Sequence, residues 1–230
     1  MTTTAPQGTE SSTSGRAVKV TLGALAAMLV VIVVIAFLVG GSDETADSPT
    51  AASARIPTEG VVRQVSFADG VGESLPRFDS SIALDPAVGQ SAPQIVGSYF
   101  DNTEVTIDLA DGTPRIVMFF AHWCPHCQSE VTSLVERFGT DGLPDGVEIV
   151  AVSTSVQEGQ PNYPPSRWFI NEGWAYPVLR DSEDSGLASA FGLSGFPFTV
   201  AVDGDGVVIA RSSGQIPDSQ FDALVAAAAS

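Results

Sequence analysis

Positions 122 to 127 hold both cysteines and both histidines of the chain, in the order His-Trp-Cys-Pro-His-Cys. The uninterrupted apolar run 116–120 leads into them, which is typical of a buried strand. After them, apolar residues recur every three or four positions as far as Phe138, which predicts an amphipathic helix beginning near Pro125. We therefore expect the Cys-x-x-Cys pair where a buried strand turns into a helix, and this context favours redox chemistry.

This placement assigns a different role to each cysteine. Cys124 would lie at the helix N-terminus, where unpaired backbone N–H groups and the helix dipole favour a thiolate, so it is the expected nucleophile. Cys127, one turn later, is the expected resolving thiol that breaks a mixed disulfide. His126 would add positive charge near the Cys124 sulfur, and Pro125 suits the first turn of a helix.

Other interpretations of the motif remain open. A structural disulfide across so short a loop would remove little entropy from the unfolded chain. A metal site, as in a copper or zinc chaperone, is chemically possible because His122, Cys124, His126 and Cys127 are all potential ligands. However, His122 precedes the helix, and the sequence contains no second ligand pair. A redox-inactive adhesion or scaffold domain is the third alternative. We favour redox chemistry, with no metal and no cofactor.

Residues 20–39 form an uncharged apolar run that is long enough to span a bilayer. Arg16 and Lys19 precede this run and acidic residues follow it, so the positive-inside rule places the N-terminus in the cytoplasm. The run is longer than the apolar core of a signal peptide, and no cleavage pattern directly follows it. We expect a disordered cytoplasmic tail over 1–19, one uncleaved transmembrane helix over 20–39, and an extracytoplasmic remainder.

The charge of the chain limits its partners. The net charge is −17, and Glu10, Arg16 and Lys19 give the first 19 residues +1, so the remainder carries −18 and contains no lysine. Such a surface argues against nucleic acid or anionic lipid headgroups as partners. An exported chain with only two cysteines has no disulfide framework, which makes this pair more credible as a functional one.

Alternating strand and helix patterns begin at Gly89. Residues 40–88 are predicted to form an extracytoplasmic linker or juxtadomain segment. A short strand is expected over 61–67, and segment 60–86 receives no role. Strands are expected at 105–109, 116–120, 147–152, 198–202 and 207–210, and helices at 125–138, 166–171, 186–191 and from Asp218 onward. This order predicts an α/β domain over 89–230 with a mixed central sheet flanked by helices.

These patterns resemble the thioredoxin superfamily, and most closely its membrane-anchored, exported TlpA/ResA-like branch of thiol–disulfide oxidoreductases. The resemblance rests on segments 89–93, 123–127, 176–181, 191–197 and 203–206, together with Glu130. It implies a thioredoxin-like fold in which Pro197 is cis and faces the active-site sulfurs. If so, the Phe196–Pro197 turn would present backbone groups with which an extended substrate can pair.

Supporting roles are assigned to three further residues. Glu130 would carry protons for the thiols or be a solvated helix residue. Trp123 would pack beside the site, and Phe196 replaces the threonine that often precedes this proline in the family.

The predicted function is disulfide exchange with exported proteins and with a redox partner protein. The branch implies a reductase of exported thiols, of the cytochrome c maturation type. The dipeptide Pro125-His126, in contrast, resembles that of DsbA-type oxidants. Because His126 would stabilise the reduced form, the sequence favours the oxidising direction, with the reductase as the alternative.

Overall fold

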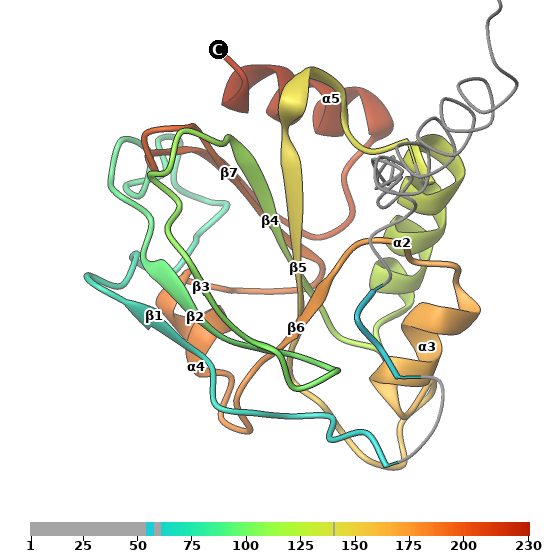
Figure 1. Ribbon diagram of the computed structural model, residues 1–230. Helices are drawn as coiled ribbons and strands as arrows, with labels where there is room; N and C mark the ends of the chain where they lie inside the picture. Colours follow the sequence, from blue (N-terminus) through green and yellow to red (C-terminus); the bar gives the residue numbers. More distant parts are fainter. Residues whose placement is uncertain (1–53, 58–60, 140) are drawn as a thin grey trace, which may run out of the picture. The chain divides into compact units, whose positions relative to one another are not determined.

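The computed structural model describes residues 54–57, 61–139 and 141–230, all within one compact unit, Pro49–Ser230 (Figure 1). The predicted cytoplasmic tail and transmembrane helix lie outside these residues. Among the described helices, none is both long and apolar enough to cross a membrane.

One mixed sheet organises the domain. Its hydrogen-bonded order is β1-β2-β6-β5-β4-β7-β8, with β3 pairing to β2. The pairs β4–β5 and β5–β6 are parallel and the others are antiparallel. The strands are β1 (Asp69–Val71), β2 (Gln94–Tyr99), β3 (Glu104–Ile107), β4 (Arg115–Phe120), β5 (Glu148–Ser153), β6 (Val178–Arg180), β7 (Phe198–Val202) and β8 (Val208–Ser213).

Helices cover both faces of the sheet, as Figure 1 shows. They are α2 (Pro125–Phe138), the short 3-10 helix η1 (Pro144–Gly146), α3 (Pro165–Asn171), α4 (Gly186–Ala190) and α5 (Asp218–Ala228). Helices α2, α3 and α5 contribute to one apolar core, and α4 contributes to the other.

Strand β4 belongs to both cores because its side chains alternate between the two faces of the sheet. All six of its residues are buried. Ile116, Met118 and Phe120 face the core with α2, whereas Val117 and Phe119 face the core with α4. Burial on both faces explains the continuous apolar run in the sequence. Strand β4 ends at Phe120, two residues before the cysteine motif begins at His122.

The thioredoxin-like α/β architecture confirms the α/β part of the predicted fold class. The predicted strands and helices after Gly89 form within one or two residues of their expected bounds, except that β8 continues three residues further, to Ser213. Strands β1, β2 and β6 were not predicted. The prediction of a short strand over 61–67 was wrong, because that segment is irregular. The nearest strand, β1, begins at Asp69.

Residues 61–88, part of the predicted linker or juxtadomain segment, pack on the domain. Leu75 and Ala87 are buried in the core with α4, and the Ser66 N–H donates to the Asp181 carbonyl at 3.1 Å. The many glycines, prolines and short apolar runs of this segment carry no period that would have indicated this packing.

Candidate active site

The turn from β4 into α2 places both thiols. Cys124 is the N-cap residue of α2, with extended backbone (φ −82°, ψ 119°), and Pro125 occupies the first turn as predicted. The first turn contains no acidic residue. Unpaired N–H groups of the helix therefore face the Cys124 position without a competing carboxylate from the same turn. Both cysteines are free thiols.

The two thiols lie in different environments. Cys124 retains 7% exposure, whereas Cys127 is fully buried. The Ala121 N–H donates to the Cys127 sulfur at 3.4 Å. Burial raises the pKa of the Cys127 thiol far above its usual range, and the proximity of Cys124 and Glu130 adds to the rise. The outer thiol is thus the one that a substrate can reach, and the inner one is held as a neutral thiol.

The loop before β7 faces Cys124 across the site. The Phe196–Pro197 peptide is cis, as the family resemblance implied, and Pro197 is buried. The Cys124 thiol lies 3.9 Å from the Phe196 carbonyl oxygen, towards which it donates. The rings of Phe196 and Trp123 meet edge to face, with centroids 5.7 Å apart. Residues 72 positions apart in the chain thus form one site.

Glu130 belongs to the buried face of α2 rather than to its solvated face. Its side chain is only 4% exposed. Burial raises the pKa of Glu130 to about 7, and the Asp218 charge adds to this. The Ile216 N–H and Arg137 act in the opposite direction. A carboxyl group that titrates near neutral pH one turn beyond Cys127 is suited to proton transfer.

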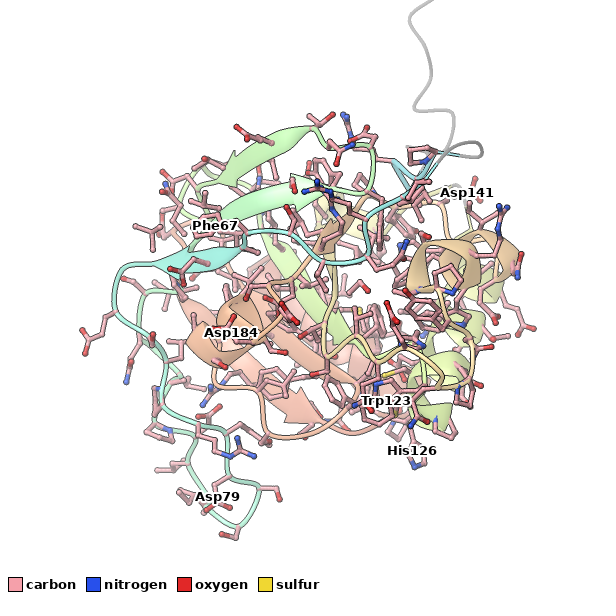
Figure 2. All side chains as sticks on the ribbon, turned by 90° about the horizontal axis from the view of Figure 1, so that it is seen from below. Phe67, Asp79, Trp123, His126, Asp141 and Asp184 are labelled. Atoms are coloured by element: carbon pink, nitrogen blue, oxygen red, sulfur yellow. The ribbon has the colours of Figure 1, made fainter. Side chains whose placement is uncertain are left out.

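His126 makes no hydrogen bond to either cysteine among the described contacts. It is exposed, and in Figure 2 its ring projects outward from the rim of the domain. Helix geometry explains this, because the buried face of α2 carries Cys127, Glu130, Val131 and Leu134. A residue adjacent to Cys127 in sequence lies about 100° away from that face. The charge of His126 is therefore screened by water.

His122 is buried and has both ring nitrogens engaged. Its Nδ1 lies 2.7 Å from the Pro161 carbonyl oxygen, which can only accept a hydrogen bond. The Gln157 N–H, which can only donate, reaches Nε2 at 3.2 Å. The ring is therefore the neutral Nδ1–H form, and burial lowers its pKa. Neither nitrogen is available to a metal without breaking one of these bonds.

The four potential ligands of the motif consequently do not converge. Within the described part of the chain, no group of three or more His, Cys, Asp or Glu side chains is arranged to hold a metal ion. The cysteines form the centre of the site, with one histidine locked beneath a loop and the other in solvent.

Sequence reasoning missed the loop 154–164, which borders the site. Trp123 donates its indole N–H to the Ser155 carbonyl at 2.9 Å, and Asn162 donates its side-chain amide to the His122 carbonyl at 3.1 Å. The Tyr163–Pro164 peptide is also cis. The only sequence signal was the Pro161 and Pro164-Pro165 cluster, which marks a loop but not its destination.

A cavity of about 490 Å³ lies away from the thiols, and neither cysteine lines it. Its charged wall is Arg115, whose guanidinium pairs with Asp111 at 2.8 Å and Glu148 at 3.2 Å. Since the Arg115 charge is already paired with these carboxylates, we assign the cavity no part in the redox chemistry.

With this geometry established, comparison with known proteins identifies the family. The AhpC/TSA family profile matches residues 88–211, more than half of the chain. The chain belongs to the AhpC/TSA family. This AhpC/TSA domain is a thiol–disulfide oxidoreductase of the thioredoxin type, with Cys124 and Cys127 as its Cys-x-x-Cys pair.

Individual relatives agree with this family assignment. The chain is 29% identical over 122 residues to the thiol-disulfide oxidoreductase ResA of Geobacillus thermodenitrificans, covering 53% of this chain and 67% of that protein. It is 30% identical over 128 residues to the thiol:disulfide interchange protein HelX of Rhodobacter capsulatus, covering 53% and 66%. The chain thus spans about two thirds of the length of these relatives.

A solved structure supports the fold. A Chlorobium tepidum protein assigned as the thiol:disulfide interchange protein DsbE superposes with a TM-score of 0.51 at 18% identity, over 62% of this chain and 98% of that one. The AhpC/TSA match covers residues 88–211, so segment 61–87 lies outside the matched region.

Proposed function

We propose that this protein is a membrane-anchored reductase of disulfides in exported polypeptides. The observation that carries the direction is the position of His126. The oxidising prediction required its positive charge beside the Cys124 sulfur, but its ring projects into solvent. Because water screens a charge on an exposed ring, the feature that favoured a strong oxidant is weakened. The resemblance to ResA and HelX supports the reductase alternative.

The proposed reaction begins with the Cys124 thiolate. It attacks one sulfur of a substrate disulfide, forming a mixed disulfide and releasing the other substrate sulfur as a thiolate that takes up a proton. The Cys127 sulfur, after losing its proton, attacks Cys124. The Cys124–Cys127 disulfide forms and the second substrate thiol leaves. Two electrons pass from the protein to the substrate, and a partner dithiol protein restores the reduced pair.

Glu130 is the proposed proton acceptor for Cys127. Burial disfavours the Cys127 thiolate, so the resolving step needs a nearby base. Glu130 is ionised above about pH 7 and is close enough to raise the pKa of Cys127 by its charge. Moving one proton from the thiol to the carboxylate keeps the charge of this buried region constant.

Pro197 and Phe196 are proposed to hold the substrate backbone, with Pro125 shaping the helix start and Trp123 packing beside the sulfur. The Phe196 carbonyl, 3.9 Å from the Cys124 sulfur, is a backbone acceptor at the point where a mixed disulfide must form. An extended substrate chain can pair with such a group in the manner of an added strand.

The cellular location is proposed from the sequence alone. The apolar stretch 20–39 would anchor the chain, with the basic flank of Arg16 and Lys19 in the cytoplasm and the catalytic domain outside. The substrates would then be exported polypeptides, the apocytochromes of cytochrome c maturation being one class. A phosphatase fused after Ser230 should be active in cells if this orientation is right.

The reduction potential of the Cys124–Cys127 pair tests the direction. We expect a value at or below that of thioredoxin, about −270 mV, measured by equilibration with glutathione or dithiothreitol. His126→Ala should shift this value by less than about 30 mV, the equivalent of tenfold in the equilibrium constant, because solvent screens the imidazole. A potential near the roughly −120 mV of DsbA would restore the oxidising interpretation. Insulin reduction by the wild type, lost in Cys124→Ser, is the activity control.

A further inference from the structure

The loop 154–164 is held at the active site by polar contacts rather than by a hydrophobic core. None of residues 155–163 is buried. Ser155 and Asn162 have positive φ values of 49° and 62°, which only a fixed set of contacts maintains in non-glycine residues. Its position near the cysteines must therefore come from hydrogen bonds, and several of them end on His122 and Trp123.

His122 makes the largest share of these contacts. Its Nδ1–H donates to the Pro161 carbonyl at 2.7 Å, and its Nε2 accepts from the Gln157 N–H at 3.2 Å. Its own carbonyl accepts the Asn162 amide at 3.1 Å, and its ring meets that of Tyr163 edge to face at 5.9 Å. A neutral imidazole can donate from one ring nitrogen and accept at the other, so a single side chain binds the loop at two points.

The loop contacts the two residues that precede the reacting cysteine. His122 and Trp123 are the two residues before Cys124, and Trp123 bonds the loop at Ser155 while packing on Phe196. Trp123 therefore stands between two walls, the loop 154–164 and the loop that carries Pro197. In Figure 2, Trp123 lies at the same edge of the domain as His126, where this site opens to solvent.

We propose that His122 is a positioning residue that holds the loop 154–164 next to Trp123. The loop would then form part of the surface that a polypeptide substrate contacts when its disulfide reaches Cys124. This inference rests on the proposed exchange with polypeptide substrates, in either direction. A small disulfide needs only access to the Cys124 sulfur. A polypeptide must also contact the loops on either side of Trp123, so loss of the His122 bonds weakens its binding more than it affects the sulfur chemistry.

The test compares two substrates with the full-length protein in detergent, reduced beforehand. One is insulin, a polypeptide disulfide, and the other is the small aromatic disulfide 5,5′-dithiobis(2-nitrobenzoate). His122→Ala should raise the half-saturating insulin concentration about tenfold, as expected for the loss of two hydrogen bonds, with little change in the maximal rate. The ratio of insulin rate to small-disulfide rate at low substrate should fall by the same factor.

Variants separate positioning from general destabilisation. His122→Asn keeps a donor where Nδ1 lies and should give an intermediate value. Asn162→Ala, at an exposed residue that cannot unfold the core, should raise the half-saturating insulin concentration in the same direction. Val117→Ala, in the opposite core, should lower stability without changing the substrate ratio.

Two results would overturn the inference. One is an unchanged half-saturating insulin concentration in both His122→Ala and Asn162→Ala. The other is a parallel fall for both substrates, which would mean that His122 acts on the sulfur or on folding alone. A wild-type protein that fails to reduce insulin would instead count against the proposed function.

Discussion

Cys127 and Glu130 show how burial of single residues sets the chemistry of this site. Both lie on the buried face of α2, and burial raises the pKa of each group. Burial moves the carboxyl towards neutrality, where it can exchange a proton with the reacting pair.

Replacing the carboxyl should therefore change the pH dependence of the resolving step. In the wild type, decay of the mixed disulfide should slow as the pH falls below about 7, because Glu130 becomes protonated. Glu130→Gln should be about 100-fold slower at pH 8 and should lose the inflection near pH 7. Rapid acid quenching and mass spectrometry of the mixed disulfide measure both. An inflection unchanged in the variant would assign it to another group.

Stability offers an independent check on Glu130. Its pKa in the folded chain is raised from 4.5 to about 7, so the stability it contributes is fully present below pH 4.5 and is lost as the pH rises through 7. Glu130→Gln should remove this decline, so its urea midpoint relative to wild type should be higher at pH 8 than at pH 5. Equal differences at both pH values would mean that Glu130 is not perturbed.

Among the elements, α4 depends on a carboxylate that precedes it by five residues. Asp181 is buried and accepts the N–H groups of Leu187 at 3.0 Å and Ala188 at 3.2 Å, in the first turn of the helix. It also accepts the Ser182 N–H at 2.8 Å. It thus satisfies orphan donors of α4 that the N-cap residue Ser185, in left-handed conformation, leaves open.

Asp181→Ala should lower the free energy of unfolding by about 2 to 3 kcal/mol, because buried N–H groups lose their acceptor. Urea denaturation measures the change. Asp184→Ala, which removes an exposed carboxylate from the same loop, is the matched control and should stay within about 0.5 kcal/mol of wild type. A loss no larger than that of the control would mean that water can replace Asp181.

At the scale of the whole molecule, residues 61–88 form part of the folded unit although the family match begins at residue 88. The Arg211 guanidinium on β8, fully buried, pairs with Asp85 at 2.5 Å and donates to the Pro76 and Phe191 carbonyls. Arg77 donates to the Leu193 carbonyl at 3.1 Å. These hydrogen bonds hold the segment against β8 and against the loop that precedes Pro197.

Asp85→Ala should destabilise the protein by about 3 kcal/mol or more, because it leaves the Arg211 charge buried without its carboxylate. Limited proteolysis should then cut within 61–88 before the rest of the domain, and urea denaturation gives the free energy. Asp79→Ala, at the tip of the projecting loop in Figure 2, is the control and should be near neutral. Proteolysis that begins elsewhere would show that this pair does not hold the segment.

Local sequence determined the strand that ends at Phe120, the helix that begins at Pro125, and the placement of both cysteines between them. Hydrophobic period and helix-end chemistry act within a few residues, so they can be read from the chain. The same period held the signal that His126 faces solvent, since Cys127 and Val131 define the buried side of the helix. The prediction for His126 followed from its side-chain chemistry and did not use its position around the helix.

Only the tertiary structure decided which distant residues meet at the site. Contact of Cys124 with Phe196, of His122 with Pro161, and of Arg211 with Asp85 depends on how the sheet orders its strands, which no local pattern encodes. The titration of Glu130 near pH 7 likewise comes from burial among groups on other elements. The local sequence thus identifies the redox pair. Long-range packing places the loops around it and buries Glu130, its proposed proton acceptor.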